Sequence, residues 1–117
     1  MRDYFYVRDA VAAYMLLAEK LPEEPFIGQA FNFGNETPLS VLEVVGTIIR
    51  SMSADWGARE PVILNEASHE IPKQYLNCSK ARRMLDWEPL FSVEAGLQET
   101  IQWYAERIGR RDLAVSF

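Results

Sequence analysis

The feature that most constrains the fold is a helix-forming segment, residues 10–20, that is apolar on nearly every face. Asp9 stands before it as a predicted N-cap, and Leu21-Pro22 ends it. Its apolar positions are Val11, Ala12, Ala13, Tyr14, Met15, Leu16, Leu17 and Ala18. A helix of this kind is covered on several sides in a folded protein. A single domain of 117 residues can hardly provide that cover by itself.

Short apolar runs alternate with helical patterns along the chain. The runs predict strands at about residues 3–7, 30–33 and 61–64. Gly34-Asn35 follows the second run and predicts a turn with positive φ. Because helical patterns separate the runs, we expect at least two strands to be parallel. The predicted fold class is α/β, with short, partly parallel strands and about four helices.

The clearest helix start is a capping box. Ser40 and Glu43 form the S-x-x-E pattern, so this helix is expected to begin at Val41. A short helix is predicted over residues 79–85, and Trp87-Glu88-Pro89 stops it. Both helices follow from patterns that span only a few residues.

The last predicted helix closes the domain. Ser92 is its expected N-cap, and its apolar stripe runs to an expected C-cap at Gly109. Residues 110–117 have no clear pattern. We therefore expect one domain over residues 1–109 and a tail over residues 110–117.

Composition excludes several classes of function. The chain has 12 Lys and Arg against 17 Asp and Glu, a net charge of −5, which disfavours general binding to nucleic acid. Cys78 is the one cysteine, so no internal disulfide can form, and His69 is the one histidine, which leaves no cluster with metal-ligand spacing. No apolar run approaches the roughly 18 residues of a membrane span. We expect a cytoplasmic protein without a metal site.

Familiar catalytic and cofactor-binding patterns are also absent from the sequence. No two of the six glycines are closer than six positions, so there is no dinucleotide-binding fingerprint, and no lysine lies four residues after any tyrosine. Cys78 with His69 could in principle form a thiol–base pair, and Glu23 with Glu24 an acid–base pair. We interpret these residues instead as a helix start, a polar loop and a solvated turn. No catalytic residue is expected.

Four blocks, in order, resemble a known family: Arg2–Ala10, Phe31–Glu43, Ser79–Pro89 and Glu99–Tyr104. They are similar to the C-terminal part of the extended short-chain dehydrogenase/reductases, the NAD(P)-dependent sugar-nucleotide epimerases and 4,6-dehydratases. The resemblance covers residues 2 to about 104 and is closest to the CDP-glucose or GDP-mannose 4,6-dehydratases.

The resemblance implies an incomplete Rossmann-like fragment. In this family the NAD or NADP loop and the catalytic Tyr-Lys pair lie in the N-terminal two thirds, an NAD-binding portion that we expect this chain to lack. The remaining third supplies the last strands of the sheet and most of the lobe that binds the nucleotide-diphosphate sugar. The parent would be a lyase or isomerase, and no cofactor is expected to bind this chain alone.

The resemblance also suggests substrate-binding residues. Arg2 matches the family arginine that contacts the diphosphate, and Glu70 matches the acid that binds ribose hydroxyls. A guanidinium suits a diphosphate because its fork donates two parallel charge-assisted bonds. Ala67 stands where many members carry a second phosphate arginine, a departure for which His69 or Lys73 could substitute. The competing interpretation is a surface arginine and a solvated loop.

Two functions therefore remain open. The first is the nucleotide-diphosphate-sugar-binding portion of a 4,6-dehydratase or epimerase, inactive as an isolated chain. The alternative is a stand-alone small-molecule-binding or protein-interaction module without a redox role. In that case the apolar faces of residues 10–20 and 4–7 would form an interface, such as that of a homo-oligomer.

Overall fold

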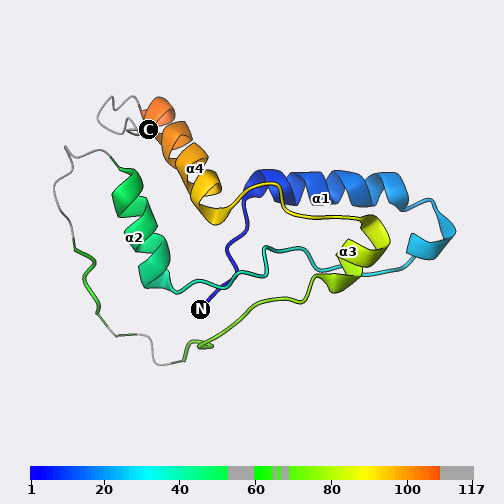
Figure 1. The fold of residues 1–117 in the computed structure, drawn as a ribbon, viewed down its shortest axis with the longest axis horizontal. Helices are drawn as coiled ribbons and strands as arrows, with labels where there is room; N and C mark the ends of the chain where they lie inside the picture. The colour runs from blue at the N-terminus through cyan, green and yellow to red at the C-terminus, as the bar shows by residue number, and fades with distance from the viewer. Residues whose placement is uncertain (53–59, 65, 67–68, 109–117) are drawn as a thin grey trace.

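A computed structural model describes residues 1–52, 60–64, 66 and 69–108. Within them the chain forms four α-helices and one 3₁₀-helix, joined by extended segments (Figure 1). In chain order these are α1 (Val7–Lys20), η1 (Glu24–Phe26), α2 (Val41–Ser51), α3 (Ser79–Leu85) and α4 (Val93–Ile108). None of the described helices is both long and apolar enough to span a bilayer.

The extended segments meet at Arg2. This residue forms an antiparallel bridge with Leu39 and a parallel bridge with Gln74. The helices and these bridges agree with the predicted α/β class. The three predicted strands, however, are wrong as paired elements: residues 3–6, 30–33 and 61–64 join no ladder among the described residues, and residue 7 already belongs to α1. A strand needs a neighbour to hydrogen-bond with, which an apolar run does not supply.

The N-terminus of α1 corrects a second prediction. The helix begins at Val7, three residues earlier than expected, and its N-cap is Tyr6, which makes no side-chain cap bond. Asp9 lies inside the first turn and is 1% exposed. Its carboxylate accepts hydrogen bonds from the backbone N–H groups of Leu90 (2.9 Å) and Phe91 (3.2 Å). Asp9 therefore joins two distant segments instead of capping its own helix.

The other helix starts are confirmed. Ser40 and Glu43 form the complete capping box, with the Glu43 backbone N–H 3.2 Å from the Ser40 hydroxyl. α3 has the predicted bounds, and the Ser92 hydroxyl accepts a hydrogen bond from the Ala95 N–H at 3.1 Å. The predicted C-cap at Gly109 and the tail over residues 110–117 lie outside the described residues.

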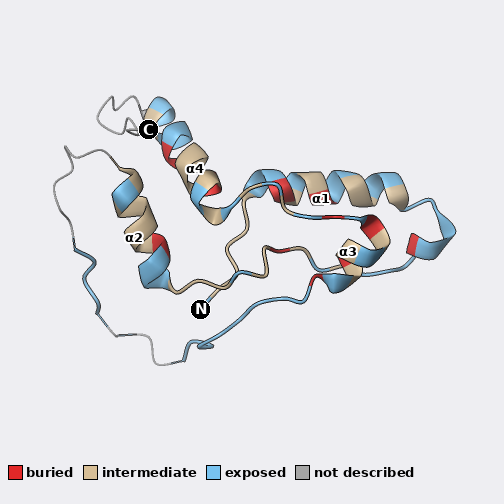
Figure 2. Cartoon of the chain, in the orientation of Figure 1, coloured by how far each residue is buried: buried red, intermediate tan, exposed pale blue. Residues whose placement is uncertain are grey.

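The core lies between α1 and α3 (Figure 2). Its buried members are Ala13, Phe26, Ala81, Leu85 and Trp87. Trp87 meets the rings of Phe5 and Phe33 edge to face, with centroids 5.7 Å and 5.0 Å apart. A second contact joins α2 to α4. The core thus uses one side of α1, while Val7, Val11, Tyr14 and Met15 on the same helix are each more than half exposed.

Candidate functional site

The predicted diphosphate residue, Arg2, lies where three segments of the chain meet. Its backbone N–H and carbonyl both bond Leu39 at 2.9 Å, and the Gln74 N–H donates to the carbonyl of the preceding residue, Met1, at 3.1 Å. The Arg2 side chain is half-buried. The two bridges therefore fix the backbone that carries this guanidinium.

The Arg2 side chain reaches the loop that carries the other predicted site residues. Its Nη1 donates hydrogen bonds to the carbonyl oxygens of Ile71 (2.8 Å) and Met1 (2.9 Å). Ile71 directly follows Glu70, so the structure brings Arg2 beside the loop of His69 and Glu70. Both of these residues are exposed, and among the described residues neither forms an ion pair. Ala67 lies outside the described residues.

Behind Arg2, Asp3 binds the loop that follows Phe33. Its Oδ2 accepts the backbone N–H of Glu36 at 3.0 Å, and the Asn35 side-chain amide donates to the Tyr4 carbonyl at 2.8 Å. Gly34 is buried here. The Asp3 carboxylate lies so close to its backbone that a Cβ at this position would collide with it. Oδ1 of Asp3 and Oδ1 of Asn35 are buried and have no hydrogen-bond partner within the described part of the chain.

Glu36 is a structural residue that the sequence analysis missed. Its Oε1 accepts the Cys78 backbone N–H at 2.8 Å, and its Oε2 forms an ion pair with Arg82 on α3. The positive φ predicted for Gly34-Asn35 falls instead on Glu36, at 53°. A turn signal at Gly34-Asn35 marked this place in the chain, but the ion pair joins residues 46 apart and leaves no local pattern.

These contacts form a continuous series of hydrogen bonds between the two halves of the predicted site. Asp3 follows Arg2 and holds Glu36, and Glu36 in turn holds Cys78 at the start of α3. Residues 69–78 lead directly into that point. The contacts of Glu36 therefore fix where this loop ends relative to Arg2.

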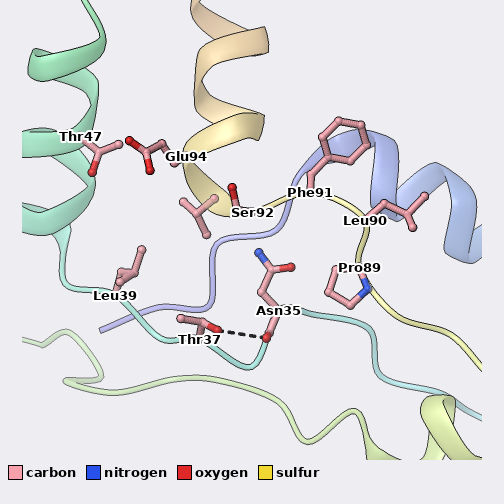
Figure 3. A pocket seen from close by; sticks show the side chains of 10 residues that line it. Asn35, Thr37, Leu39, Thr47, Pro89, Leu90, Phe91, Ser92 and Glu94 are labelled. Atoms are coloured by element: carbon pink, nitrogen blue, oxygen red, sulfur yellow. Dashed lines mark hydrogen bonds between the residues drawn. The ribbon is translucent and has the colours of Figure 1, made fainter.

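A separate hollow of about 470 Å³ opens between α2 and α4 (Figure 3). It is lined by Asn35, Thr37, Leu39, Thr47, Pro89, Leu90, Phe91, Ser92, Val93 and Glu94. Figure 3 shows Thr37 donating to the Asn35 carbonyl, at 3.3 Å, and the Thr47 and Glu94 side chains across the hollow. Hydroxyl, amide and carboxylate groups can all bind a small polar molecule. None of these residues was selected as a candidate from the sequence.

A third cluster joins the start of α1 to α4. Glu99 accepts hydrogen bonds from the Tyr6 hydroxyl (2.8 Å) and from Arg8 Nη1 (3.0 Å). The hydrogen bond to Glu99 raises the pKa of Tyr6, and the bonds from Tyr6 and Arg8 lower the pKa of Glu99. Gly96 allows this contact, since a Cβ there would lie 2.8 Å from Tyr6 Cγ. The cluster borders a hollow of about 530 Å³ with Trp103 and Tyr104.

The residues weighed for catalysis are not brought together. Cys78 is fully buried, and this burial raises the pKa of its thiol, which favours the unreactive neutral form. His69 is exposed in the loop. Glu23 forms an ion pair with Lys20, which does not fit an acid–base pair with Glu24. Among the described residues, no three His, Cys, Asp or Glu side chains gather to hold a metal ion.

No protein-family model and no solved structure matches the chain, but several known proteins do. A dTDP-glucose 4,6-dehydratase of Neisseria gonorrhoeae is 29% identical over 97% of this chain and 34% of its own length. The chain is similar to sugar-nucleotide dehydratases and epimerases.

Two further relatives are also named for sugar-nucleotide substrates. A UDP-glucuronate 4-epimerase of Thermodesulfobacterium geofontis is 28% identical over 92% of the chain and 31% of its own length. A UDP-N-acetyl-alpha-D-glucosaminuronate decarboxylase of Bacillus cytotoxicus is 31% identical over 90% of the chain and 32% of its own length. The chain thus spans about a third of each relative. The resemblance to sugar-nucleotide enzymes is confirmed, and the CDP-glucose or GDP-mannose type stays a prediction.

Proposed function

We propose that this chain is the nucleotide-diphosphate-sugar-binding portion of an extended short-chain dehydrogenase/reductase, a 4,6-dehydratase or epimerase. The observation that carries the proposal is the meeting of Arg2 with the loop of Glu70, at two positions where the family resemblance places substrate contacts. The similarity to dTDP- and UDP-sugar enzymes supports the same substrate class.

In this proposal Arg2 holds the diphosphate. Its guanidinium now donates to two neutral carbonyl oxygens, of Met1 and Ile71. Phosphate oxygens make stronger, charge-assisted bonds to the same donors. Turning the guanidinium toward a diphosphate therefore releases the Ile71 carbonyl and leaves the backbone bridges of Arg2 in place.

Glu70 and His69 would complete the contacts from the exposed loop. An exposed carboxylate can accept hydrogen bonds from both ribose hydroxyls, and an imidazole next to it can donate to a phosphate oxygen. Because both side chains are exposed, they are free to turn toward a ligand without breaking an ion pair within the described residues.

The residues of this chain do not fit a dinucleotide cofactor. A cradle for NAD or NADP needs a strand, closely spaced glycines and a helix start, in that order. The one described glycine with positive φ, Gly28, follows the 3₁₀-helix η1 instead of a strand. Redox chemistry on the sugar therefore belongs to a part of the parent protein that this chain does not span, and we expect no turnover from the chain alone.

Calorimetric titration of the chain with dTDP-glucose, UDP-glucuronate, CDP-glucose and GDP-mannose tests the proposal. We expect binding of at least one sugar nucleotide, weakened about tenfold or more by Arg2→Ala, because charged hydrogen bonds contribute about 1.5–3 kcal/mol. Glu70→Ala should weaken it less, and His69→Ala tests the substitution for the missing arginine. Arg83→Ala, an exposed arginine on α3, is the matched control.

Two results would overturn the proposal. The first is no detectable binding of any of the four ligands. The second is binding that Arg2→Ala and Glu70→Ala leave unchanged. Oxidation or reduction of NAD(P)(H) by the purified chain with these sugars would contradict the expectation that it is inactive alone.

A further inference from the structure

The outer face of α1 is an apolar surface without a partner among the described residues. We define it by Val7, Val11, Tyr14, Met15 and Leu21, which are 64%, 51%, 76%, 60% and 48% exposed. Val7, Val11, Tyr14 and Met15 lie at positions i, i+4, i+7 and i+8 of a helical stripe, and Leu21 follows as the C-cap residue. The opposite side of the same helix holds the buried Ala13 and packs on α3.

Two aromatic side chains of α4 extend this surface. Val7 lines the 530 Å³ hollow together with Trp103 and Tyr104, each 52% exposed. The Arg107 guanidinium lies 5.1 Å from the centre of the Trp103 ring. Tyr, Trp, Met and Arg are the residue types enriched in protein interfaces and their hot spots. The continuous surface thus has the composition of a docking site for another polypeptide.

The arrangement of the described segments indicates that no sheet covers the outer face of α1. In α/β proteins a helix buries its apolar stripe on a sheet, whereas the extended segments here meet only at the two bridges of Arg2 among the described residues. The radius of gyration is 17.6 Å, against roughly 13 Å for a compact chain of this length. The chain lies open, with one side of α1 in the core and the other in solvent (Figure 2).

The relatives indicate what covers this surface. Almost the whole chain aligns with about a third of the Neisseria gonorrhoeae dehydratase, so about two thirds of that protein has no counterpart here. At the edges of the surface, Arg8 is paired with Glu99 and the Arg107 guanidinium lies over the Trp103 ring. An apolar layer of an α/β polypeptide fits it better than a charged ligand does.

We propose that the outer face of α1, with Trp103 and Tyr104, docks an α/β polypeptide equivalent to the two thirds of the relatives that this chain does not span. This proposal rests on the proposed function and adds the surface through which the two parts join. It holds whether the partner lies in the same polypeptide or in another one.

Co-expression tests the docking. The tagged chain is produced with the portion of the Neisseria gonorrhoeae dehydratase outside the match, and the complex is measured by co-purification and sedimentation. We expect a one-to-one complex that Tyr14→Glu and Val11→Glu each weaken about tenfold or more, because a buried carboxylate without a partner is costly. Leu90→Glu is the matched control: Leu90 is 82% exposed and lies outside this surface.

A second measurement avoids dependence on a separately folded partner. In a chimera, this chain replaces the matching third of the Neisseria gonorrhoeae enzyme, and its thermal unfolding midpoint is recorded. Tyr14→Glu should lower the midpoint by several degrees more than Leu90→Glu, and the effect should be absent in the isolated chain, where Tyr14 is already exposed.

Three results separate the explanations. Equal effects of Tyr14→Glu and Leu90→Glu in both experiments would overturn the docking surface. A homodimer of the chain alone that Tyr14→Glu dissociates would replace the proposed partner by a second copy. Arg2→Ala should leave the complex intact, because Arg2 is not part of this surface. A complex of the unchanged chain that binds no sugar nucleotide would overturn the proposed function and keep the docking surface.

Discussion

Two regions of this molecule both contain apolar side chains but bury them to very different extents. In the packed region, around α1, α3 and the segment after α3, Cys78 and Ala81 are fully buried and Trp87 is 4% exposed. In the exposed arm, the described part of residues 60–76, Val62 is 83% and Leu64 68% exposed. Apolar side chains are therefore buried where other segments reach them, and not wherever they occur.

The proposed substrate site lies across the border between these regions. Arg2 precedes α1 and is bridged to Leu39 and to Gln74, and Glu70 belongs to the exposed arm. The hydrogen bond from Arg2 to the Ile71 carbonyl is one of the contacts that joins them. A diphosphate bound by Arg2 would replace that bond.

The largest expected effect is in the packed region. Trp87→Ala removes the ring that contacts Phe5 and Phe33 and should cost about 3–5 kcal/mol in the free energy of unfolding. Urea denaturation measures it. A cost below about 1 kcal/mol would show that this region is not a packed core.

Asp9 gives the next largest expected effect. Asp9→Ala leaves the N–H groups of Leu90 and Phe91 without their acceptor, at a cost of about 2–3 kcal/mol. If Asp9 were a helix cap, as the sequence suggested, Asp9→Ser would restore most of the stability. We expect no such rescue, because a serine hydroxyl cannot reach both amides.

A substitution in the capping box of α2 should have a smaller effect. Ser40→Ala removes both hydroxyl contacts with Glu43 and should destabilise the protein by about 1 kcal/mol. Ser79→Ala, in the first turn of α3, is the matched control, because among the described residues Ser79 hydrogen-bonds through its backbone N–H, to Asn77 Oδ1, and not through its hydroxyl. Equal effects of the two variants in thermal unfolding would contradict the role of the box.

Acid should weaken the contact between α1 and α4. Tyr6 and Arg8 lower the pKa of Glu99, so the ionised carboxylate is favoured in the folded state. Its contribution is present above the unfolded pKa, about 4.3, and is lost as pH falls through the lower folded value. Glu99→Gln should therefore lower the unfolding midpoint at pH 7 and have little effect at pH 3. An equal effect at both values would exclude this charge dependence.

The smallest expected effect is in the exposed arm. Ile63→Ala should change the free energy of unfolding by less than about 0.5 kcal/mol, because Ile63 is 61% exposed. A loss of 2 kcal/mol or more, on the scale of about 2–5 for a buried Ile→Ala change, would show that residues 60–64 are buried in solution. Such a result would remove the contrast between the two regions.

Elements that depend on neighbours a few residues apart follow from the amino-acid sequence alone. The start of α2 follows from Ser40 and Glu43, three positions apart, and α3 and the Ser92 cap follow from equally short patterns. The resemblance to sugar-nucleotide enzymes could also be recognised from the sequence, because the motifs that carry it are short and local. Arg2 and Glu70 could be named as a pair, but their meeting could not be worked out from spacing.

Features that depend on partners far apart in the chain arise only in the folded arrangement. Asp9 became a buried acceptor for residues 81 and 82 positions away, and Glu36 took the positive φ and the ion pair with Arg82. The apolar run at residues 61–64 stayed extended and exposed, since no other described segment pairs with it. A residue's own pattern fixes its local preference, but the free energy of burial and of hydrogen bonding depends on what the rest of the chain brings to it.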